Sequence, residues 1–202
     1  MIKDWYGKIA GVYAYPLEVH EDDRGYVFEI ITQRYSDELE IPHVYLATAR
    51  EGVAKAFHAH LYQYDRFCVV HGSAKIGLVD LRGPIHDYVE EYRVDQWAYL
   101  AEKDERGNPK GFLDLWPTPE DWYNAVGIGG ETASFLESDT FILTGERPHL
   151  LFIPPGVAHG QMALDRMSFL INLPTKVYNQ EAPDELRIPF DALGYDWEVK
   201  SR

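Results

Sequence analysis

The chain has few thiols and few positive charges, and it has no long apolar run. Its single cysteine, Cys68, excludes a disulfide within the chain, and its place in an apolar stretch predicts a buried, inert thiol. There are 19 basic and 33 acidic side chains, and the formal charge of −14 argues against nucleic acid and anionic membranes as partners. No apolar run reaches about 18 residues and no signal-peptide core follows Met1, so we expect a cytoplasmic protein.

The rest of the composition is that of a folded domain. Apolar residues make up 46% of the 202 residues, and the aromatic side chains include 14 Tyr, 9 Phe and 5 Trp. This is enough for one core, so we expect a single domain over residues 1–202. Residues 95–139 differ, with a charged loop followed by a Trp- and Pro-rich segment, and we expect an inserted loop and helix there. Such an insertion either covers the site or elaborates the surface.

Short β-branched and aromatic stretches alternate with glycine-containing turns. They predict strands at 26–31, 43–49, 54–60, 66–71, 73–81, 150–154, 159–164 and 167–173. This spacing is typical of an all-β sandwich or barrel and not of alternating strands and helices. Besides the helix in the insertion, short helices are expected at 33–42 and near 190–197, where the tail would cap the barrel.

The segment from Gly52 to Gly72 carries the strongest chemical signal. His58 and His60 stand two residues apart, so both imidazoles point to the same face of a strand. The carboxylate Asp65 follows, at a spacing that resembles the first motif of the cupin barrels, with Asp in place of their usual Glu. Pro154–His159 resembles the second cupin motif, Pro-x-Gly-x-x-His. Together these motifs imply a cupin double-stranded β-helix, or jelly-roll, barrel.

Further segments resemble the dTDP-4-dehydrorhamnose 3,5-epimerases. Asp23–Glu29 is similar to their DxRGxFxE opening, and Val79–Arg82 matches their VDLR strand. Leu143–Gly160 is similar to their LSxEN…LWIPPGFAHG segment, and Tyr178–Trp197 to their closing YxPxxE…LGIDW. The resemblance implies cofactor-free proton removal next to the keto group of a nucleotide-activated 4-keto-6-deoxysugar. We expect a homodimer, because barrels of this kind commonly pair edge strands.

Two features depart from the epimerase pattern. The sequence Ala56–His60 reads AFHAH and is more like the HAHK motif of the related sugar 3,4-ketoisomerases. Asn172 stands where the epimerases carry their catalytic tyrosine, and an amide cannot deliver a proton as a phenol can. We therefore expect single-site epimerisation or 3,4-keto migration in preference to the full 3,5 reaction.

The resemblance implies a role for each catalytic candidate. His58 matches the base, and an imidazole suits a base that works near neutral pH. His60 would shuttle a proton, stabilise the enolate or orient its neighbour, while Asp65 would hold an imidazole in its productive tautomer. His159 stands where the family keeps a site histidine. Tyr178 is the nearest surviving phenol and a candidate for the missing acid.

The resemblance also implies a set of substrate-binding residues. Arg24 matches the phosphate-binding arginine, and Lys55 falls where a second cation would lie. Glu29 matches a residue near the base, and Asn172 would line the sugar site.

Two alternatives remain open. His58, His60, Asp65 and His159 form a three-histidine, one-carboxylate set that suits one divalent metal ion, such as iron, manganese, nickel or zinc. A dioxygenase or a metal-dependent isomerase would use all four as ligands. The amide at Asn172 is also compatible with a non-catalytic barrel that binds a nucleotide sugar.

Overall fold

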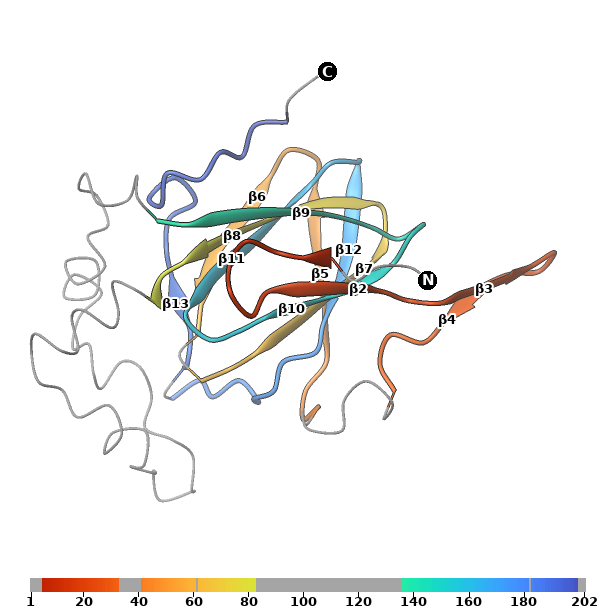
Figure 1. The fold of residues 1–202 in the computed structure, drawn as a ribbon, viewed down its shortest axis with the longest axis horizontal. Helices are drawn as coiled ribbons and strands as arrows, with labels where there is room; N and C mark the ends of the chain where they lie inside the picture. Colours follow the sequence, from red (N-terminus) through yellow and green to blue (C-terminus); the bar gives the residue numbers. More distant parts are fainter. Residues whose placement is uncertain (1–4, 33–40, 61, 83–135, 182, 200–202) are drawn as a thin grey trace, which may run out of the picture.

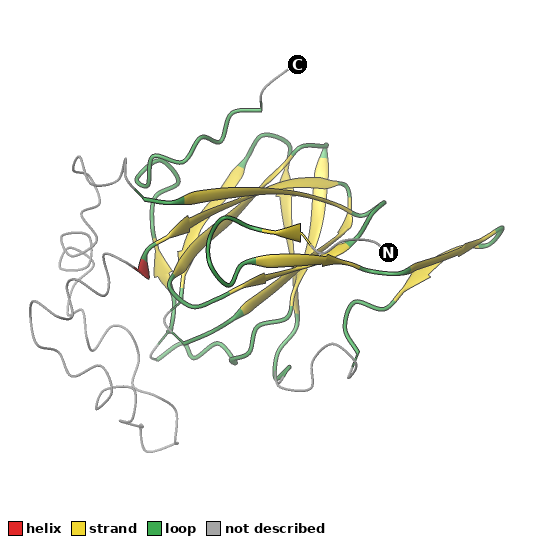
Figure 2. Cartoon of the chain, viewed as in Figure 1, coloured by secondary structure: helices red, strands yellow, loops and turns green. Residues whose placement is uncertain are grey.

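The thirteen elements in the described part of the chain are β-strands, and Arg82, at the end of the described segment 62–82, is the one described residue in helical conformation (Figures 1 and 2). The computed structural model describes residues 5–32, 41–60, 62–82, 136–181 and 183–199. The predicted helix at 33–42 and the predicted insertion at 95–139 fall almost wholly outside these residues. The strands are β1 (Trp5–Tyr6), β2 (Tyr13–Pro16), β3 (Val19–Asp22), β4 (Gly25–Phe28), β5 (Tyr45–Arg50), β6 (Ala54–Ala59), β7 (Asp65–His71), β8 (Ser73–Asp80), β9 (Ser138–Thr144), β10 (His149–Ile153), β11 (Val157–Ala163), β12 (Met167–Asn172) and β13 (Leu186–Arg187).

Two antiparallel sheets form the body. One sheet has the order β1-β2-β10-β7-β12-β5 and the other β13-β6-β11-β8-β9. Successive strands alternate between the two sheets from β5 to β8 and again from β9 to β13, as in a jelly roll. The prediction of an all-β cupin barrel is therefore confirmed.

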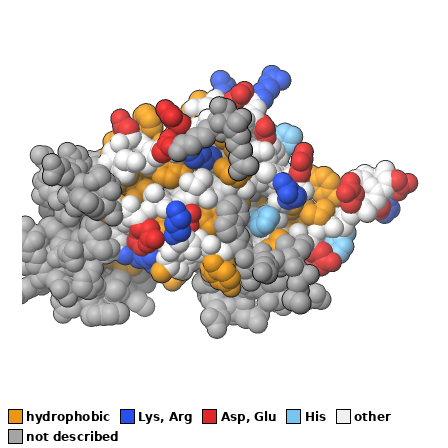
Figure 3. All heavy atoms as spheres, turned by 45° about the horizontal axis from the view of Figure 1, so that its top comes forward, with side chains coloured by type: hydrophobic (Ala, Val, Ile, Leu, Met, Phe, Trp, Pro, Cys, Tyr) orange, Lys and Arg blue, Asp and Glu red, His pale blue; other side chains and the backbone are white. Residues whose placement is uncertain are grey.

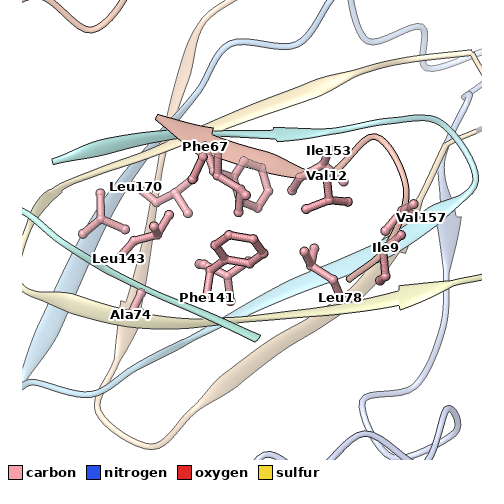
Figure 4. Packing of buried hydrophobic residues seen from close by; sticks show 14 residues of the cluster. Ile9, Val12, Phe67, Ala74, Leu78, Phe141, Leu143, Ile153, Val157 and Leu170 are labelled. Carbon is pink, nitrogen blue, oxygen red and sulfur yellow. The ribbon is translucent and has the colours of Figure 1, made fainter. Parts of the chain in front are cut away.

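Apolar side chains from both sheets fill the space between them. Phe67 and Ile153 point from the six-stranded sheet toward Phe141 and Leu78 of the five-stranded sheet (Figure 4). All four are at most 7% exposed, and burying each one is worth about 1.5–3 kcal/mol. The rings of Phe67 and His159 also contact each other edge to face, with 5.4 Å between their centroids. The apolar core thus ends against the histidine of the second cupin motif.

A two-stranded hairpin, β3–β4, projects from the body (Figures 1 and 3). Its turn was predicted at Glu21–Gly25, and Gly25 adopts a φ of 128°, which an L-amino acid rarely accepts. Tyr26 and Val27 on β4 are 56% and 64% exposed. The space-filling view shows the projection standing clear of the barrel, with acidic side chains on it (Figure 3).

The helix predicted near 190–197 was wrong, although the segment does cap the barrel. Residues 190–193 form a turn in which the Ala192 amide donates to the Pro189 carbonyl oxygen, and Gly194 follows with a φ of 64°. A left-handed residue at this position ends any continuing helix. The rings of Tyr195 and Trp197 then pack on the Phe57 ring, with centroid distances of 5.8 and 5.4 Å.

Cys68 on β7 is buried, and burial raises the pKa of its thiol to about 12. The prediction of an inert thiol is consistent with this environment. Within the described residues, no helix has the length and apolar character needed to span a membrane.

Candidate active site

A buried carboxylate joins histidines from the opposite sheet. Asp65 begins β7 of the six-stranded sheet, whereas His159 lies on β11 and His60 directly follows β6 of the five-stranded sheet. Asp65 Oδ2 lies 2.9 Å from His159 Nε2 and 3.3 Å from His60 Nε2. All three residues are at most 7% exposed. The cluster therefore ties the two sheets together next to the core.

Amide side chains satisfy the second oxygen of this carboxylate. Gln63 Nε2 donates to Asp65 Oδ1 at 2.8 Å, and Asn172 Nδ2 donates to the same oxygen at 2.9 Å. Gln63 lies in the loop between β6 and β7 and was not predicted as a site residue. Asn172 was predicted at the sugar site, and its amide contacts the carboxylate of the cluster.

The far nitrogen of each buried imidazole is bound to a backbone carbonyl. His159 Nδ1 lies 3.0 Å from the Val157 oxygen, and His60 Nδ1 contacts the Asp184 oxygen. The Asp184 carboxylate in turn accepts hydrogen bonds from the backbone amides of Tyr62 and Gln63 at 3.0 and 3.1 Å. Both nitrogens of His60 are therefore engaged by the protein.

These contacts set the charges of the cluster. Burial alone would lower the pKa of His60, but hydrogen bonds and charge attraction from Asp65, with Asp184 adding to them, raise its pKa to about 9. Burial alone would raise the pKa of Asp65, but the hydrogen bonds with His159 and His60 hold its pKa well below the usual range. At neutral pH, His60 is an imidazolium beside a carboxylate.

His58 occupies a different environment, at the rim of a pocket of about 450 Å³. Removal from bulk water and the neighbouring His159 lower the pKa of His58, and the carboxylate of Glu185 opposes them. The result is an accessible imidazole that is neutral at physiological pH. The pocket is lined by His43, Tyr45, His58, His60, Gln63, Pro174, Lys176, Tyr178, Asp184, Glu185 and Arg187.

The short strand β13 brings charged groups to this rim. Arg187 pairs with His58 across the β6–β13 ladder, and Arg187 Nε donates to Glu185 Oε1 at 2.5 Å. Arg187 and His58 keep the pKa of Glu185 below its usual range, although burial acts in the opposite direction. Neither residue was predicted as part of the site, because a two-residue strand leaves no periodic pattern in the sequence.

Two phenols face the same pocket. Tyr178, which was predicted, lies in the connection between β12 and β13 and is 53% exposed. Tyr45 was not predicted; it begins β5, directly opposite Asn172 in the β5–β12 ladder. Asn172 Nδ2 donates to the Tyr45 hydroxyl oxygen at 2.8 Å.

None of the four predicted substrate-binding residues is among those that line this pocket, and Asn172 is fully buried beside Asp65. Arg24 lies at the tip of the projecting hairpin, exposed and paired with Asp22, and Glu29 follows β4. Lys55 is exposed on β6.

The possible metal ligands are fewer than the sequence indicated. Among the described residues, one ligand atom each from His60, Asp65 and His159 lies within 4.8 Å of the others. His58, the fourth expected ligand, is not in this set and lies at the pocket rim. A two-histidine, one-carboxylate set of this kind can hold a divalent ion, but here the same atoms also lie within ion-pair distance of one another.

No family model matches the chain. The spore coat polysaccharide biosynthesis protein SpsL of Bacillus subtilis is 30% identical over 200 residues, which cover 96% of this chain and 99% of SpsL. The probable low-salt glycan biosynthesis epimerase Agl13 of Haloferax volcanii is 29% identical over 190 residues, 91% of each chain.

Solved structures share the fold at low identity. The dTDP-6-deoxy-D-glucose-3,5-epimerase RmlC of Legionella pneumophila, in complex with dTDP-4-keto-L-rhamnose, superposes with a TM-score of 0.65 at 17% identity, over 100% of this chain and 86% of that one. NovW, a 4-keto-6-deoxy sugar epimerase of Streptomyces spheroides, gives a TM-score of 0.63 at 17% identity, over 98% and 80% of the two chains.

Proposed function

The chain belongs to the dTDP-4-dehydrorhamnose 3,5-epimerase-like family of cupins, and we propose that it epimerises or isomerises a nucleotide-activated 4-keto-6-deoxysugar. As a member of this family it is a sugar epimerase or isomerase of carbohydrate biosynthesis, the setting named for SpsL and Agl13. The proposed reaction begins with removal of a proton from the carbon next to the keto group. The resulting enolate is then protonated again.

The placement of His58 carries the proposal. Proton removal requires a neutral base within hydrogen-bond reach of the substrate, and His58 is accessible at the pocket rim with a lowered pKa. His60 is less suited to this step, because both of its nitrogens are bound by the protein and its pKa is raised. We therefore assign the base to His58 and a supporting role to the buried cluster beneath it.

The rim of the pocket suits an anionic substrate in spite of the acidic chain. Lys176 and Arg187 both line it and can contact a diphosphate. Crystals of an RmlC relative contain dTDP-4-keto-L-rhamnose, and those of a relative from Bacillus anthracis contain TDP and pyrophosphate. By analogy, we propose a nucleoside diphosphate sugar as the substrate of this chain.

A second copy of the chain would explain the position of the remaining predicted residues. Arg24 and Glu29 belong to the projecting hairpin and its exit, which carry exposed apolar side chains such as Tyr26 and Val27. Docking of this hairpin on a partner would cover these side chains and could bring Arg24 to the partner's pocket. We therefore include a homodimer in the proposal.

The proposed reaction uses no cofactor. The carbon acid is activated by its own keto group, so a base and an acid are sufficient for the exchange. The His60–Asp65–His159 cluster then acts as an ion-paired support, since Asp65 Oδ2 faces both imidazole Nε2 atoms. Metal analysis of the purified protein tests this part directly.

The decisive experiment combines metal analysis with solvent exchange. The purified protein is incubated in D₂O with dTDP-4-keto-6-deoxyglucose, and NMR follows deuterium at C3 and C5. We expect exchange by chelator-treated, metal-free protein, reduced about 10²–10⁴-fold by His58→Asn. His149→Asn is the matched control, because His149 bonds the Arg147 carbonyl outside the pocket.

Each result separates two interpretations. Exchange that survives His58→Asn would refute the assignment of the base. Stoichiometric metal without any exchange would favour the metal-dependent cupin, and binding of the nucleotide sugar without exchange would favour a non-catalytic barrel. The labelled carbon distinguishes reaction at C3 from reaction at C5.

A further inference from the structure

We propose that Tyr45 is the acid that returns a proton to the substrate carbon, from the side of the pocket opposite His58. The inference rests on the proposed function and assigns the group that Asn172 cannot supply. It depends on three observations: the hydrogen bonds of Asn172, the sheets that carry the two side chains, and the surroundings of the competing phenol Tyr178.

Asn172 fixes the orientation of the Tyr45 hydroxyl group. The Asn172 side chain is fully buried; its Oδ1 accepts from the Arg66 amide at 3.1 Å, and its Nδ2 donates to Asp65 Oδ1 at 2.9 Å. The same nitrogen donates to the Tyr45 oxygen at 2.8 Å. Because this amide nitrogen can only donate, the Tyr45 oxygen is the acceptor, and its own proton remains available for another acceptor. Tyr45 lines the pocket, so a bound substrate is such an acceptor.

Tyr45 and His58 approach the pocket from different sheets. Tyr45 begins β5, the edge strand of the six-stranded sheet, and His58 lies on β6 of the five-stranded sheet. Both side chains line one pocket of about 450 Å³. A sugar ring held between the two sheets therefore presents one face to the base and the other face to the phenol, which is the arrangement that inversion at a carbon requires.

The proton balance follows from these positions. His58 takes the proton from the carbon next to the keto group and becomes an imidazolium, while the electron pair moves into the enolate. Tyr45 then gives its hydroxyl proton to the opposite face of the same carbon and becomes a phenolate, as the keto group is restored. Solvent removes the proton from His58 and returns one to Tyr45. Burial and the nearby Asp65 carboxylate raise the pKa of Tyr45, so the resting phenol carries its proton at neutral pH.

Tyr178 lacks comparable support. It is 53% exposed in the connection between β12 and β13, and its hydroxyl makes no hydrogen bond to the described residues. A general acid has to be held within hydrogen-bond reach of the carbon that it protonates. Tyr45 has such an anchor in Asn172, and the anchor is itself fixed by Asp65 and Arg66.

The test separates proton removal from inversion. Wild type, Tyr45→Phe, the competing variant Tyr178→Phe and the matched control Tyr6→Phe are each incubated with dTDP-4-keto-6-deoxyglucose in D₂O. Tyr6 serves as the control because it is 71% exposed on β1 and does not line the pocket. NMR then measures deuterium uptake and the configuration of the labelled carbon. We expect wild type and Tyr6→Phe to exchange and invert, and we expect inversion to depend on Tyr45 more strongly than on Tyr178. Tyr45→Phe should keep exchange within about threefold, because His58 can return deuterium to the face from which it removed the proton, while inversion falls about 10²–10⁴-fold.

Other outcomes would overturn the assignment. Inversion that survives in Tyr45→Phe, or that is lost in Tyr178→Phe, would exclude Tyr45 as the acid. Wild-type protein that exchanges without inverting would do the same. Wild-type protein that neither exchanges nor inverts would instead refute the proposed function on which the assignment rests. Circular dichroism and thermal unfolding of each variant check that the fold is intact.

Discussion

Raising the pH should weaken the fold by removing a proton from His60. The folded-state pKa of His60 is raised from its ordinary 6.5 to about 9 by the contacts with Asp65 and Asp184. A raised pKa means that the folded chain holds this proton more tightly than the unfolded chain. The stabilisation of the folded state by the protonated His60 is therefore complete below about pH 6.5 and is lost as the pH rises through about 9.

The magnitude follows from the same two values. Each pKa unit corresponds to about 1.4 kcal/mol, so a rise from 6.5 to about 9 is worth on the order of 3 kcal/mol of unfolding free energy. His60 is only 7% exposed, so solvent screens this interaction little. Against a typical stability of about 5–15 kcal/mol, such a loss is readily measured.

The assay compares wild type with His60→Gln in urea, at several values between about pH 6 and pH 10, after chelator treatment. Other groups that titrate in this range, such as Cys68, contribute equally to both proteins and cancel in the difference. As the pH rises over this range, the unfolding free energy of wild type should fall by about 3 kcal/mol more than that of the variant. Parallel pH profiles would refute the reasoning. If the variant does not fold, ¹⁵N NMR of wild-type histidines provides the test: His60 should keep the imidazolium shifts to about pH 8.

Two further predictions concern the pocket rim and the C-terminal cap. The Glu185 carboxylate raises the pKa of His58, so Glu185→Gln should lower this pKa and move the acidic limb of kcat/KM to lower pH. Arg187 lowers the pKa of His58, so Arg187→Gln should move the acidic limb to higher pH. Shifts of both variants in the same direction would contradict the assigned charges. Gly77→Ala should cost about 1–3 kcal/mol, because a Cβ there would lie 2.6 Å from the Tyr195 ring. Thermal unfolding measures this cost, and an unchanged melting temperature would show that the cap is loosely held.

The strands of the barrel could be predicted because their signals are local. The expected strand at 73–81 corresponds to β8 (Ser73–Asp80), and the expected strand at 167–173 to β12 (Met167–Asn172). The prediction of a helix at 190–197 was wrong for an equally local reason. The apolar residues of this segment fit a helix, but Gly194 adopts a positive φ, and the aromatic side chains find their partners on the barrel wall.

The candidate site could be predicted only where its residues belong to sequence motifs. His58, His60 and His159 stand out through their spacing, whereas Glu185 and Gln63 do not. Glu185 reaches the rim because the two-residue strand β13 pairs with β6, and such a pairing depends on the folded barrel. Gln63 lies in a loop, and its contact with Asp65 depends on the path of that loop. Residues of this kind become visible only when strand register is known.

Asn172 shows why a substitution at one position does not decide the fate of a site. Taken alone, an amide at the position of a catalytic tyrosine predicts a missing acid. In the β5–β12 ladder, however, Asn172 pairs directly with Tyr45, and its amide donates to the Tyr45 hydroxyl. Partners across a ladder have side chains on the same face, so a phenol on either strand can reach the same pocket. The chemistry of such a barrel is therefore a property of the strand pair, and an acid absent from one strand has to be sought on its neighbour.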